Sequence, residues 1–409
     1  MAGVSVIGLG TVGSETVRLL LEHEVELRSV CDSDPARLKR LTVPARVRRL
    51  KDFDSALRDS EIIVELIGGV GPAKKLMLKA LRAGKHVVTA NKHLLSRHWP
   101  EVFAAARKAG TQVRFEGAVA GCIPIIQALR TGLAANKVLS IHGILNGTTN
   151  YILSKMAHDG GSMKQALAEA QRLGMAERDP SLDLSGADTT HKLSILASLV
   201  SGAWVKPQLI PCRGIEGIES EDIRFAVDKL GRTPRLLGTA RFGDGLEAHV
   251  QPAFVPLKHP LAAVHGGYNA VFVDCDPAGD LMFYGKGAGA GPAASAVVSD
   301  VLELSAGVRG PLPAAAPAAP LLPESAAPRY LKLKVKDVPG ALGSITTTLG
   351  RAGVSIAQIH QSAVHNPRHW VPIMIVTHAT ERAPLEKALK SILSSSIVTR
   401  PFTCLRILD

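Results

Sequence analysis

Charged side chains are dense between Gly174 and Lys192, where the chain reads GMAERDPSLDLSGADTTHK. Four acids lie in this stretch, at Glu177, Asp179, Asp183 and Asp188. Its second half predicts a helix with Ser185 as the N-cap, on which Asp188 and Lys192 share a face. The helix continues as the apolar run LSILASLV, which predicts that it is buried. Charges at the start of a buried helix cost free energy unless they are paired or bind a ligand. We therefore expect a pocket here, although a surface ion pair is the ordinary interpretation of such a spacing.

A glycine-rich turn lies close to the first residue. Residues 4–13 read VSVIGLGTVG, a β-branched run that leads into G-x-G-x-x-G, and a helix-like SETVRLLLE follows. This order of strand, turn and helix indicates dinucleotide binding. Gly8 permits the turn, Gly10 lets the backbone approach a pyrophosphate, and Gly13 allows close packing of helix and strand. The N–H groups expected to hold phosphate oxygens are those of Thr11, Val12 and Gly13.

An acid follows the second expected strand, VELRSV. Asp32 lies nineteen residues beyond Gly13, where a carboxylate can accept hydrogen bonds from the adenosine ribose. This position favours NAD. Three basic residues follow it, at Arg37, Lys39 and Arg40. They would neutralise the additional phosphate of NADP or form a solvated helix face, so NADP stays open.

Two later strands also end in residues that could do chemistry. Lys92 follows the buried strand HVVTA, which places it at the carboxyl edge of a parallel sheet, where ligands bind. Glu116 ends another strand and is followed by a Gly/Ala loop. One carboxylate with backbone carbonyls suits a weakly held monovalent cation, and a structural turn is the alternative. Four polar residues open a later helix and would cap it or touch a ligand: Asn146, Thr148, Thr149 and Asn150.

The hydrophobic pattern changes in the second half of the chain. Alternation typical of a mostly antiparallel sheet occurs in residues 235–242, 246–256, 268–275 and 279–285. A second glycine-rich loop follows, and the helix after it is expected to return to the first domain. Residues 308–328 are rich in Pro and Ala and predict an extended linker. Residues 329–409 parse as β-α-β-β-α-β, the ferredoxin-like order.

The expected fold class is therefore α/β. A Rossmann-type nucleotide-binding domain occupies residues 1–132 and is completed by 286–307. An α+β catalytic and dimerisation domain with a mostly antiparallel sheet occupies 133–285, and a ferredoxin-like domain follows the linker at 329–409.

Composition excludes several classes of protein. The 409 residues carry a formal charge of +12, but basic residues are scattered and only 4% of residues are aromatic, so nucleic acid is not an expected partner. The five cysteines are far apart without a C-x-x-C pair, which indicates neither a zinc site nor a disulfide framework. Without a membrane-length apolar run or a signal sequence, we expect a cytoplasmic protein with no membrane partner.

These segments together resemble homoserine dehydrogenases that carry a C-terminal ACT domain. The strongest match is Ala170 to Lys192, which follows the family pattern around D-P-x2-D and G-x-D-x3-K. GILNGTTNYIL, TANK, F-E-x-A-V-A-G-x-I-P-I-I and MFYGKGAG are similar to further family segments, and the resemblance covers nearly the whole chain. It implies reversible reduction of L-aspartate 4-semialdehyde to L-homoserine with NADH or NADPH, in threonine, methionine and isoleucine biosynthesis.

The resemblance also implies roles for individual residues. Lys192 would be the general acid, and Lys92 would contact cofactor and substrate. Substrate-binding acids would be Glu177 and Asp188, with Asp183 a weaker candidate. The nicotinamide side would be lined by Gly174, Gly287 and Gly289. A sodium ion would be held by Glu116 and the carbonyls of Val119, Gly121 and Ile123. The ACT domain implies inhibition by threonine, and a homodimer or homotetramer is expected.

Two alternatives stay open. In the first, the chain is an inactive NAD or amino-acid sensor that acts through its ACT domain. In the second, it is another Rossmann dehydrogenase that acts on an amino-acid aldehyde. Intact Lys92, Glu177, Asp188 and Lys192 argue against an inactive protein. His191 is adjacent to Lys192 and should point away from it on a helix, so we expect His191 to serve packing.

Overall fold

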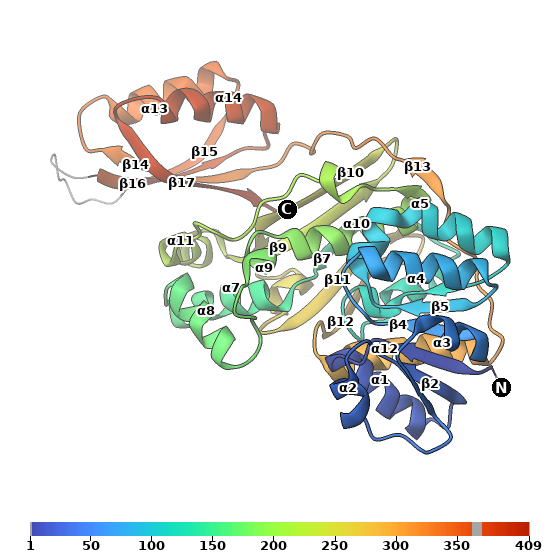
Figure 1. Ribbon diagram of the computed structural model, residues 1–409. Coiled ribbons are helices and arrows are strands. Elements are labelled where there is room, and N and C mark those ends of the chain that lie inside the picture. Colours follow the sequence, from blue (N-terminus) through green and yellow to red (C-terminus); the bar gives the residue numbers. More distant parts are fainter. Residues whose placement is uncertain (1, 362–369, 409) are drawn as a thin grey trace.

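The first part of the chain forms a six-stranded parallel sheet. The computed structural model describes residues 2–361 and 370–408 (Figure 1). In sheet order the strands are β3 (Arg48–Leu50), β2 (Leu27–Cys31), β1 (Val4–Ile7), β4 (Ile62–Glu65), β5 (His86–Thr89) and β6 (Val113–Arg114). Every neighbouring pair is parallel, and β1, β4 and β5 are short strands rich in Val and Ile that are buried on both faces apart from half-buried His86. Their carboxyl ends therefore meet at one edge.

Helices cover both faces of this sheet. Those that alternate with its strands are α1 (Thr11–Glu22), α2 (Pro35–Arg40), α3 (Phe53–Asp59), α4 (Gly71–Arg82) and α5 (Lys92–Ala109). A later helix, α12 (Ala290–Ser305), joins them from far along the chain: Val297 and Val301 pack with Val6 and Val17 in one apolar cluster. The return of the chain to the first sheet is visible at the bottom of Figure 1, where α12 lies beside α1.

The second sheet has nine strands. In sheet order they are β12 (Gly279–Lys286), β11 (Tyr268–Asp276), β7 (Lys137–Ile144), β9 (Arg232–Phe242), β10 (Leu246–Pro256), β17 (Val398–Ile407), β14 (Arg329–Lys336), β16 (Trp370–Thr377) and β15 (Ile356–Gln361). The first five pair antiparallel. The α/β fold class, with a parallel sheet, a mostly antiparallel sheet and a terminal β-α-β-β-α-β domain, is confirmed.

Further helices pack around the second sheet. The helices that precede β9 in the sequence are α6 (Ile125–Gln127), α7 (Gly147–Asp159), α8 (Met163–Arg172), α9 (Ser181–Leu184), α10 (Ala187–Ser201) and α11 (Ser220–Leu230). The terminal domain contributes α13 (Ala341–Arg351) and α14 (Arg382–Leu393). Within the described residues, every helix is too short or too polar to cross a membrane.

The terminal domain is joined edge to edge with the antiparallel part of the second sheet. Strand β17 pairs in parallel with β10 through Ala253–Arg406 and Phe254–Ile407, so the two sheets form one continuous surface. The sequence predicted two separate units and gave no sign of this pairing. In Figure 1 the red β17 reaches from the terminal domain to the strands below it.

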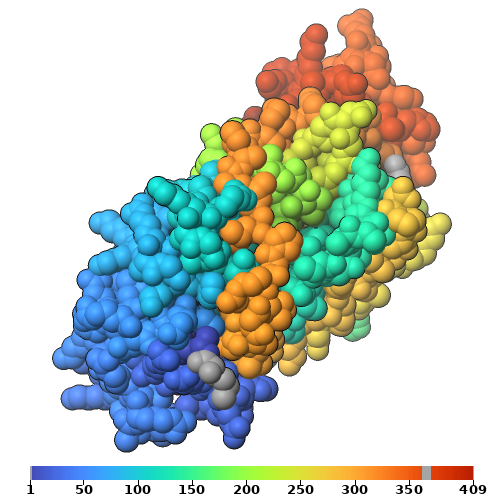
Figure 2. All heavy atoms as spheres, turned by 90° about the vertical axis from the view of Figure 1, so that its right-hand side faces the viewer, coloured from blue at the N-terminus to red at the C-terminus, as the bar shows by residue number. Residues whose placement is uncertain are grey.

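The Pro/Ala-rich segment before the terminal domain is extended but not free. The indole nitrogen of Trp99 donates to the Ala314 carbonyl at 3.0 Å, and Arg107 donates to the Pro313 carbonyl at 2.8 Å. Its short strand β13 (Ala316–Ala318) pairs with β8 (Ala203–Trp204). Figure 2 shows this orange stretch of the chain crossing the surface between the blue and green parts. The segment therefore ties the two sheets together along its length.

A buried ion cluster fixes the terminal domain to α11. The Asp222 carboxylate is fully buried and lies 3.1 Å from the Lys332 ammonium. It also accepts a hydrogen bond from the Tyr330 hydroxyl at 2.8 Å. Lys332 donates further to Glu219 at 2.6 Å. A buried carboxylate of this kind is tolerated only while its partners stay in place.

Replacing Lys332 by Met tests this cluster. Lys332→Met removes the cation that faces buried Asp222, so we expect the free energy of unfolding to fall by about 3 kcal/mol in urea titrations. Lys387→Met, at an exposed position of α14, is the matched control and should change it by less than about 0.5 kcal/mol. Equal stability of the two variants would contradict the role given to the cluster.

Candidate active site

Asp188 is the centre of the charged stretch that dominates the sequence. Its Oδ1 lies 2.9 Å from the Lys92 ammonium and its Oδ2 lies 2.7 Å from the Lys192 ammonium. The Asn146 amide donates to the same Oδ2 at 2.9 Å. Burial alone would raise the pKa of this carboxyl, but the two ammonium groups and these hydrogen bonds hold the pKa of Asp188 well below its usual range. The carboxylate therefore remains charged and holds both lysines in one place.

Lys192 has little freedom at this position. The residue is 8% exposed, and its ammonium donates to the Leu145 carbonyl at 2.6 Å as well as to Asp188. An ammonium has three N–H groups, so one is left for a ligand in the adjoining cleft.

The helix that carries both residues begins differently from the expectation. Gly186, with φ of 84°, immediately precedes α10, so the prediction that Ser185 caps this helix is wrong. The turn from α9 into α10 needs the left-handed conformation, which Gly adopts without strain. Ser185 instead ends α9, and its carbonyl accepts from the Cys212 thiol at 3.2 Å.

Asn146 was expected either to cap a helix or to touch a ligand. It caps α7 by accepting from the Thr149 N–H at 2.9 Å. Its amide group also donates to Asp183 at 2.7 Å and to Asp188, so it joins two acids of the charged stretch. Its position between a strand and a helix was the signal in the sequence, and that signal left open whether Asn146 caps the helix or touches a ligand.

Lys92 is positioned by the first turn of α5. Its neighbour Asn91 caps the helix through the Leu94 N–H at 3.1 Å. Ser96, one turn further, shares a hydrogen bond of 2.8 Å with Nδ1 of His191, which also packs edge-to-face on His93. Burial together with His93 lowers the pKa of His191 to about 4, so the ring is neutral near pH 7. His191 thus joins α10 to α5, the two helices that carry the lysines, in addition to the packing that was expected.

A cleft of about 530 Å³ opens beside this cluster. Predicted residues that line it are Lys92, Gly174, Glu177, Asp183, Asp188, Lys192 and Gly289. Asn146 and Thr148, expected to cap a helix or touch a ligand, also line it. Met175, Tyr268 and Lys286 line it without having been predicted. The Thr148 hydroxyl donates to the Met175 carbonyl at 2.9 Å, which holds the segment carrying Glu177 against α7. Glu177 is exposed, whereas Asp183 is half-buried.

Gly287 does not line the cleft as expected. A Cβ on Gly287 would lie 1.9 Å from the Asn269 side chain, and one on Gly121 would lie 2.5 Å from the Lys286 carbonyl oxygen. The second glycine-rich loop is thus pressed between Asn269 and the loop around Gly121. Close packing accounts for a glycine at position 287, and its neighbours Lys286, Ala288 and Gly289 line the cleft.

The dinucleotide turn has a different constraint at each glycine. A Cβ on Gly8 would lie 2.6 Å from the Leu66 backbone, and one on Gly13 would lie 1.9 Å from the Gly8 carbonyl oxygen. A Cβ on Gly10 would meet nothing within 4 Å, so the described protein leaves the space beside Gly10 open. The first-turn N–H groups of Thr11, Val12 and Gly13 have no acceptor among the described residues.

Asp32 has a structural role that the sequence did not reveal. Its Oδ2 accepts from the Leu9 N–H at 2.7 Å and its Oδ1 accepts from the Asp34 N–H at 2.8 Å. The carboxylate therefore holds the dinucleotide turn to the end of β2. Arg37 lies 3.4 Å from Oδ2 and is half-exposed beside a second cleft of about 960 Å³, which Gly10 and Thr11 also line.

Glu116 and the loop after it form a compact arrangement. Its two carboxylate oxygens accept from the Ile126 and Gln127 N–H groups, each at 2.8 Å. Burial, opposed by these hydrogen bonds, raises the pKa of Glu116 to about 7. In the described part of the chain the carbonyls of Val119 and Gly121 have no hydrogen-bond donor, whereas that of Ile123 accepts from Ile125. The described residues include no cluster of three His, Cys, Asp or Glu side chains that could hold a metal.

Comparison with known proteins identifies the same organisation. The family model described as homoserine dehydrogenase, NAD binding domain, matches residues 8–116; that described as homoserine dehydrogenase matches 124–302; and that of the ACT domain matches 329–394. The chain is 38% identical to the homoserine dehydrogenase of Neisseria gonorrhoeae over 98% of both chains. It is 39% identical to that of Mycobacterium bovis, over 95% of this chain and 94% of the relative.

Solved structures give the same result. A homoserine dehydrogenase from Thiobacillus denitrificans superimposes with a TM-score of 0.91 at 36% identity, covering 100% of this chain and 98% of the other.

The glycines of the turn give a paired prediction. Gly10→Ala should leave thermal stability unchanged while weakening NADH binding at least about tenfold, because its Cβ meets only the space that a dinucleotide would fill. Gly13→Ala should instead lower the melting temperature, because its Cβ meets the Gly8 carbonyl. Gly132→Ala, at another position with open space, is the control for both measurements. Unchanged NADH affinity in Gly10→Ala, measured by fluorescence titration, would contradict the assignment of this turn.

Proposed function

Because this chain belongs to the homoserine dehydrogenase family, oxidoreductases with an NAD-binding domain, we propose that it reversibly reduces L-aspartate 4-semialdehyde to L-homoserine. The observation that carries the proposal is the buried Asp188 carboxylate with two lysine ammonium groups at the cleft. That cleft is bounded on one side by Gly289, at the start of the helix that packs on the dinucleotide-binding sheet.

Lys192 is the proposed proton donor. When bound, the nicotinamide supplies a hydride to the aldehyde carbon, and negative charge develops on the aldehyde oxygen. A fixed ammonium stabilises that charge and supplies the proton. Two of the three N–H groups of Lys192 are held by Leu145 and Asp188, which directs the remaining one to the substrate. In the reverse direction the same nitrogen accepts the proton from the alcohol.

The amino-acid part of the substrate carries an ammonium and a carboxylate. Asp188 is expected from the resemblance to bind it, but both oxygens of Asp188 already face lysines. We therefore assign the substrate ammonium to Glu177 and Asp183, which line the same cleft and are less buried. Lys92 and Lys286 supply cations in the cleft for the substrate carboxylate. Asp188 then acts on the substrate through the two lysines that it positions.

NAD is the favoured cofactor in this proposal, and NADP is the alternative. Asp32 lies at the end of β2, where its negative charge disfavours an added phosphate on the ribose. Against this, Arg37 and Arg40 line the neighbouring cleft and would neutralise such a phosphate. The turn itself serves either dinucleotide.

A sodium ion is proposed at the loop after Glu116. The free carbonyls of Val119 and Gly121 are the hard oxygen ligands that such a cation takes, and Ala120 adopts a left-handed φ of 58° between them. Ile123 and Glu116 complete the proposed set, each sharing its oxygens with the hydrogen bonds already described. An ion there would brace the loop that packs on Gly287 and so reach the cleft indirectly.

The wider role follows from the family. We place the reaction in threonine, methionine and isoleucine biosynthesis in the cytoplasm, with threonine as a feedback effector through the ACT domain and a homodimer or homotetramer as the assembly. The ACT match and its junction with the catalytic sheet support regulation through this domain.

Turnover tests the proposed reaction directly. Purified protein should oxidise NADH or NADPH in the presence of L-aspartate 4-semialdehyde. Lys192→Met should lower kcat/KM by roughly a thousandfold, as loss of a proton donor and of charge stabilisation predicts. The exposed Lys164→Met serves as the control and should retain full activity. Absence of turnover in the wild type would refute the reaction.

The proposed cation site gives a separate prediction. Replacing sodium chloride by N-methylglucamine chloride should lower the rate of turnover.

The cofactor preference has its own test. Arg37→Ser removes the half-exposed guanidinium beside Asp32, so KM for NADPH should rise about tenfold while KM for NADH changes less than twofold. Arg46→Ser, at an exposed position outside this cleft, is the matched control. An equal rise for both cofactors would show that Arg37 does not discriminate between them.

A further inference from the structure

The first turn of α7 reaches several walls of the active-site cleft. Asn146 holds two acids of the cleft, and the Thr148 hydroxyl holds the Met175 carbonyl at 2.9 Å. Asn150 lies one turn after Asn146 and is only 1% exposed. It faces the 264–268 turn, which is the end of the connection between β10 and β11.

The amide group of Asn150 is surrounded by carbonyl oxygens of this turn. Its Nδ2 donates to Val264 at 3.1 Å, to Gly266 at 3.0 Å and to Tyr268 at 3.2 Å. An amide nitrogen carries two hydrogens, so they are shared among the three acceptors. In the described part of the chain, the carbonyls of Val264 and Gly266 have no other donor. The conformation of the turn therefore depends on this one side chain.

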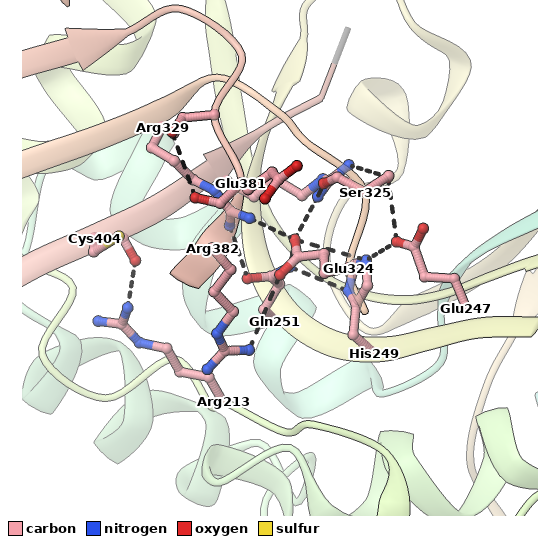
Figure 3. Close-up of polar contacts among 12 residues, drawn as sticks. Arg213, Glu247, His249, Gln251, Glu324, Ser325, Arg329, Glu381, Arg382 and Cys404 are labelled. Atoms are coloured by element: carbon pink, nitrogen blue, oxygen red, sulfur yellow. Dashed lines mark hydrogen bonds and ion pairs between the residues drawn. The ribbon is translucent and has the colours of Figure 1, made fainter. Parts of the chain in front are cut away.

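A buried guanidinium holds the segment just before the turn. Arg235 is fully buried and donates to the carbonyls of Leu261 at 3.4 Å and Ala262 at 2.6 Å. Arg329, by contrast, faces the Glu324 carboxylate at 2.7 Å (Figure 3). Arg235 has no carboxylate partner among the described residues, and burial lowers the pKa of Arg235 to about 10. A buried cation of this kind is stable only while its acceptors stay in place, so the turn has a rigid base.

The 264–268 turn supplies part of the apolar surface of the cleft. Gly267 and Tyr268 line the cleft, and Met175 and Tyr268 provide the large apolar side chains of its lining. The two apolar segments meet at Gly267, where a Cβ would lie 3.8 Å from the Met175 sulfur. A Cβ on Gly147 would lie 2.6 Å from the Gly267 carbonyl oxygen. The turn thus packs directly on the start of α7, which sets the position of this wall.

The Tyr268 ring has a fixed orientation and a free surface. It is stacked on Tyr284, with ring centroids 5.1 Å apart and planes inclined by 12°. Tyr268 lies opposite Lys286 in the pairing of β11 with β12, and both residues line the cleft. Although it belongs to a paired strand, Tyr268 is 37% exposed. The proposed substrate carries a methylene group between its charged end and its aldehyde, and an aromatic surface in the cleft suits that group.

We propose that Asn150 is a positioning residue for aldehyde reduction, which fixes the 264–268 turn so that the Tyr268 ring contacts the methylene group of the substrate. Asn150 itself lies outside the lining of the cleft and acts through Tyr268. Lys192 is held by Leu145 and Asp188, so loss of Asn150 weakens substrate binding and leaves the chemical step intact. This inference rests on the proposed function, because it adds a contact to the same substrate.

Steady-state kinetics of Asn150→Leu tests the positioning role, since Leu is close to Asn in size and has no donor. KM for L-aspartate 4-semialdehyde should rise about tenfold, while kcat and the dissociation constant of NADH stay within about threefold of the wild type. Asn150→Ser keeps one hydroxyl donor and should give an intermediate KM, and it carries the test if Asn150→Leu does not fold. A folded variant with the KM of the wild type would overturn the proposal.

The matched control is Ser154→Ala. Ser154 lies one turn further along α7, is buried, and its hydroxyl has no hydrogen-bond partner among the described residues. Ser154→Ala should therefore keep the kinetic constants of the wild type.

A second pair of variants tests whether Asn150 acts through Tyr268. Tyr268→Ala should itself raise KM for the aldehyde. Adding Asn150→Leu to Tyr268→Ala should raise KM by less than about twofold more, because the ring that Asn150 positions is already gone. Two independent increases that multiply would show that Asn150 does not act through Tyr268.

Amide hydrogen exchange separates this inference from the proposed reaction. Asn150→Leu should speed exchange in peptides covering residues 264–268 at least about tenfold and leave those covering 187–201 unchanged, whereas Ser154→Ala should change neither. Unchanged exchange at 264–268 would overturn the role of Asn150 whether or not the protein reduces the aldehyde. Absence of turnover in the wild type would overturn the proposed reaction and the substrate contact of Tyr268, and the exchange result would still decide whether Asn150 fixes the turn.

Discussion

The active-site architecture depends on keeping one carboxylate charged out of water. Asp188 is 7% exposed, and a carboxylate in such a place is unfavourable unless cations and hydrogen bonds surround it. Lys92, Lys192 and Asn146 meet this need from three different elements. The same contacts bring the end of the parallel sheet, the first helix of the catalytic part and α10 to one point. The contacts that stabilise the buried charge of Asp188 are thus the same contacts that position the lysines of the site.

The second sheet extends this arrangement to the end of the chain. Pairing of β10 with β17 makes the terminal domain part of a continuous sheet. The buried Asp222–Lys332 pair and the hydrogen bonds that join Gln251 of β10 to Glu324 and Arg329 also hold this junction. Movement of the domain away from α11 would separate Lys332 from buried Asp222, which disfavours independent motion of the domain. Regulation through this domain would therefore act by small shifts at the junction instead of by release of a tethered module.

Local patterns in the sequence predicted the elements well. Strand, turn and helix around Gly8, the alternation in the second half and the order of the terminal domain each reflect contacts within a few residues. The four-residue spacing of Asp188 and Lys192 belongs to the same class, since it needs only a helix to bring them together.

Local sequence patterns could not predict contacts between residues that are far apart in the chain. Asn146 meets Asp188 across 42 residues, and His191 meets Ser96 across 95, so neither role can be seen in local spacing. Composition indicated a linker before the terminal domain, but the acceptors that Trp99 and Arg107 find there are set by tertiary packing. The close packing of Gly287 on Asn269 was not foreseen for the same reason, because Asn269 comes from another strand.

A double-mutant cycle on Asp188→Asn and Lys192→Met tests most directly the claim that Asp188 acts through the lysines that it holds. If the two residues work as one unit, kcat/KM of the double variant should equal that of the weaker single variant within about threefold. If the two losses instead multiply, Asp188 acts independently of Lys192, which contradicts the claim that Asp188 positions the proton donor.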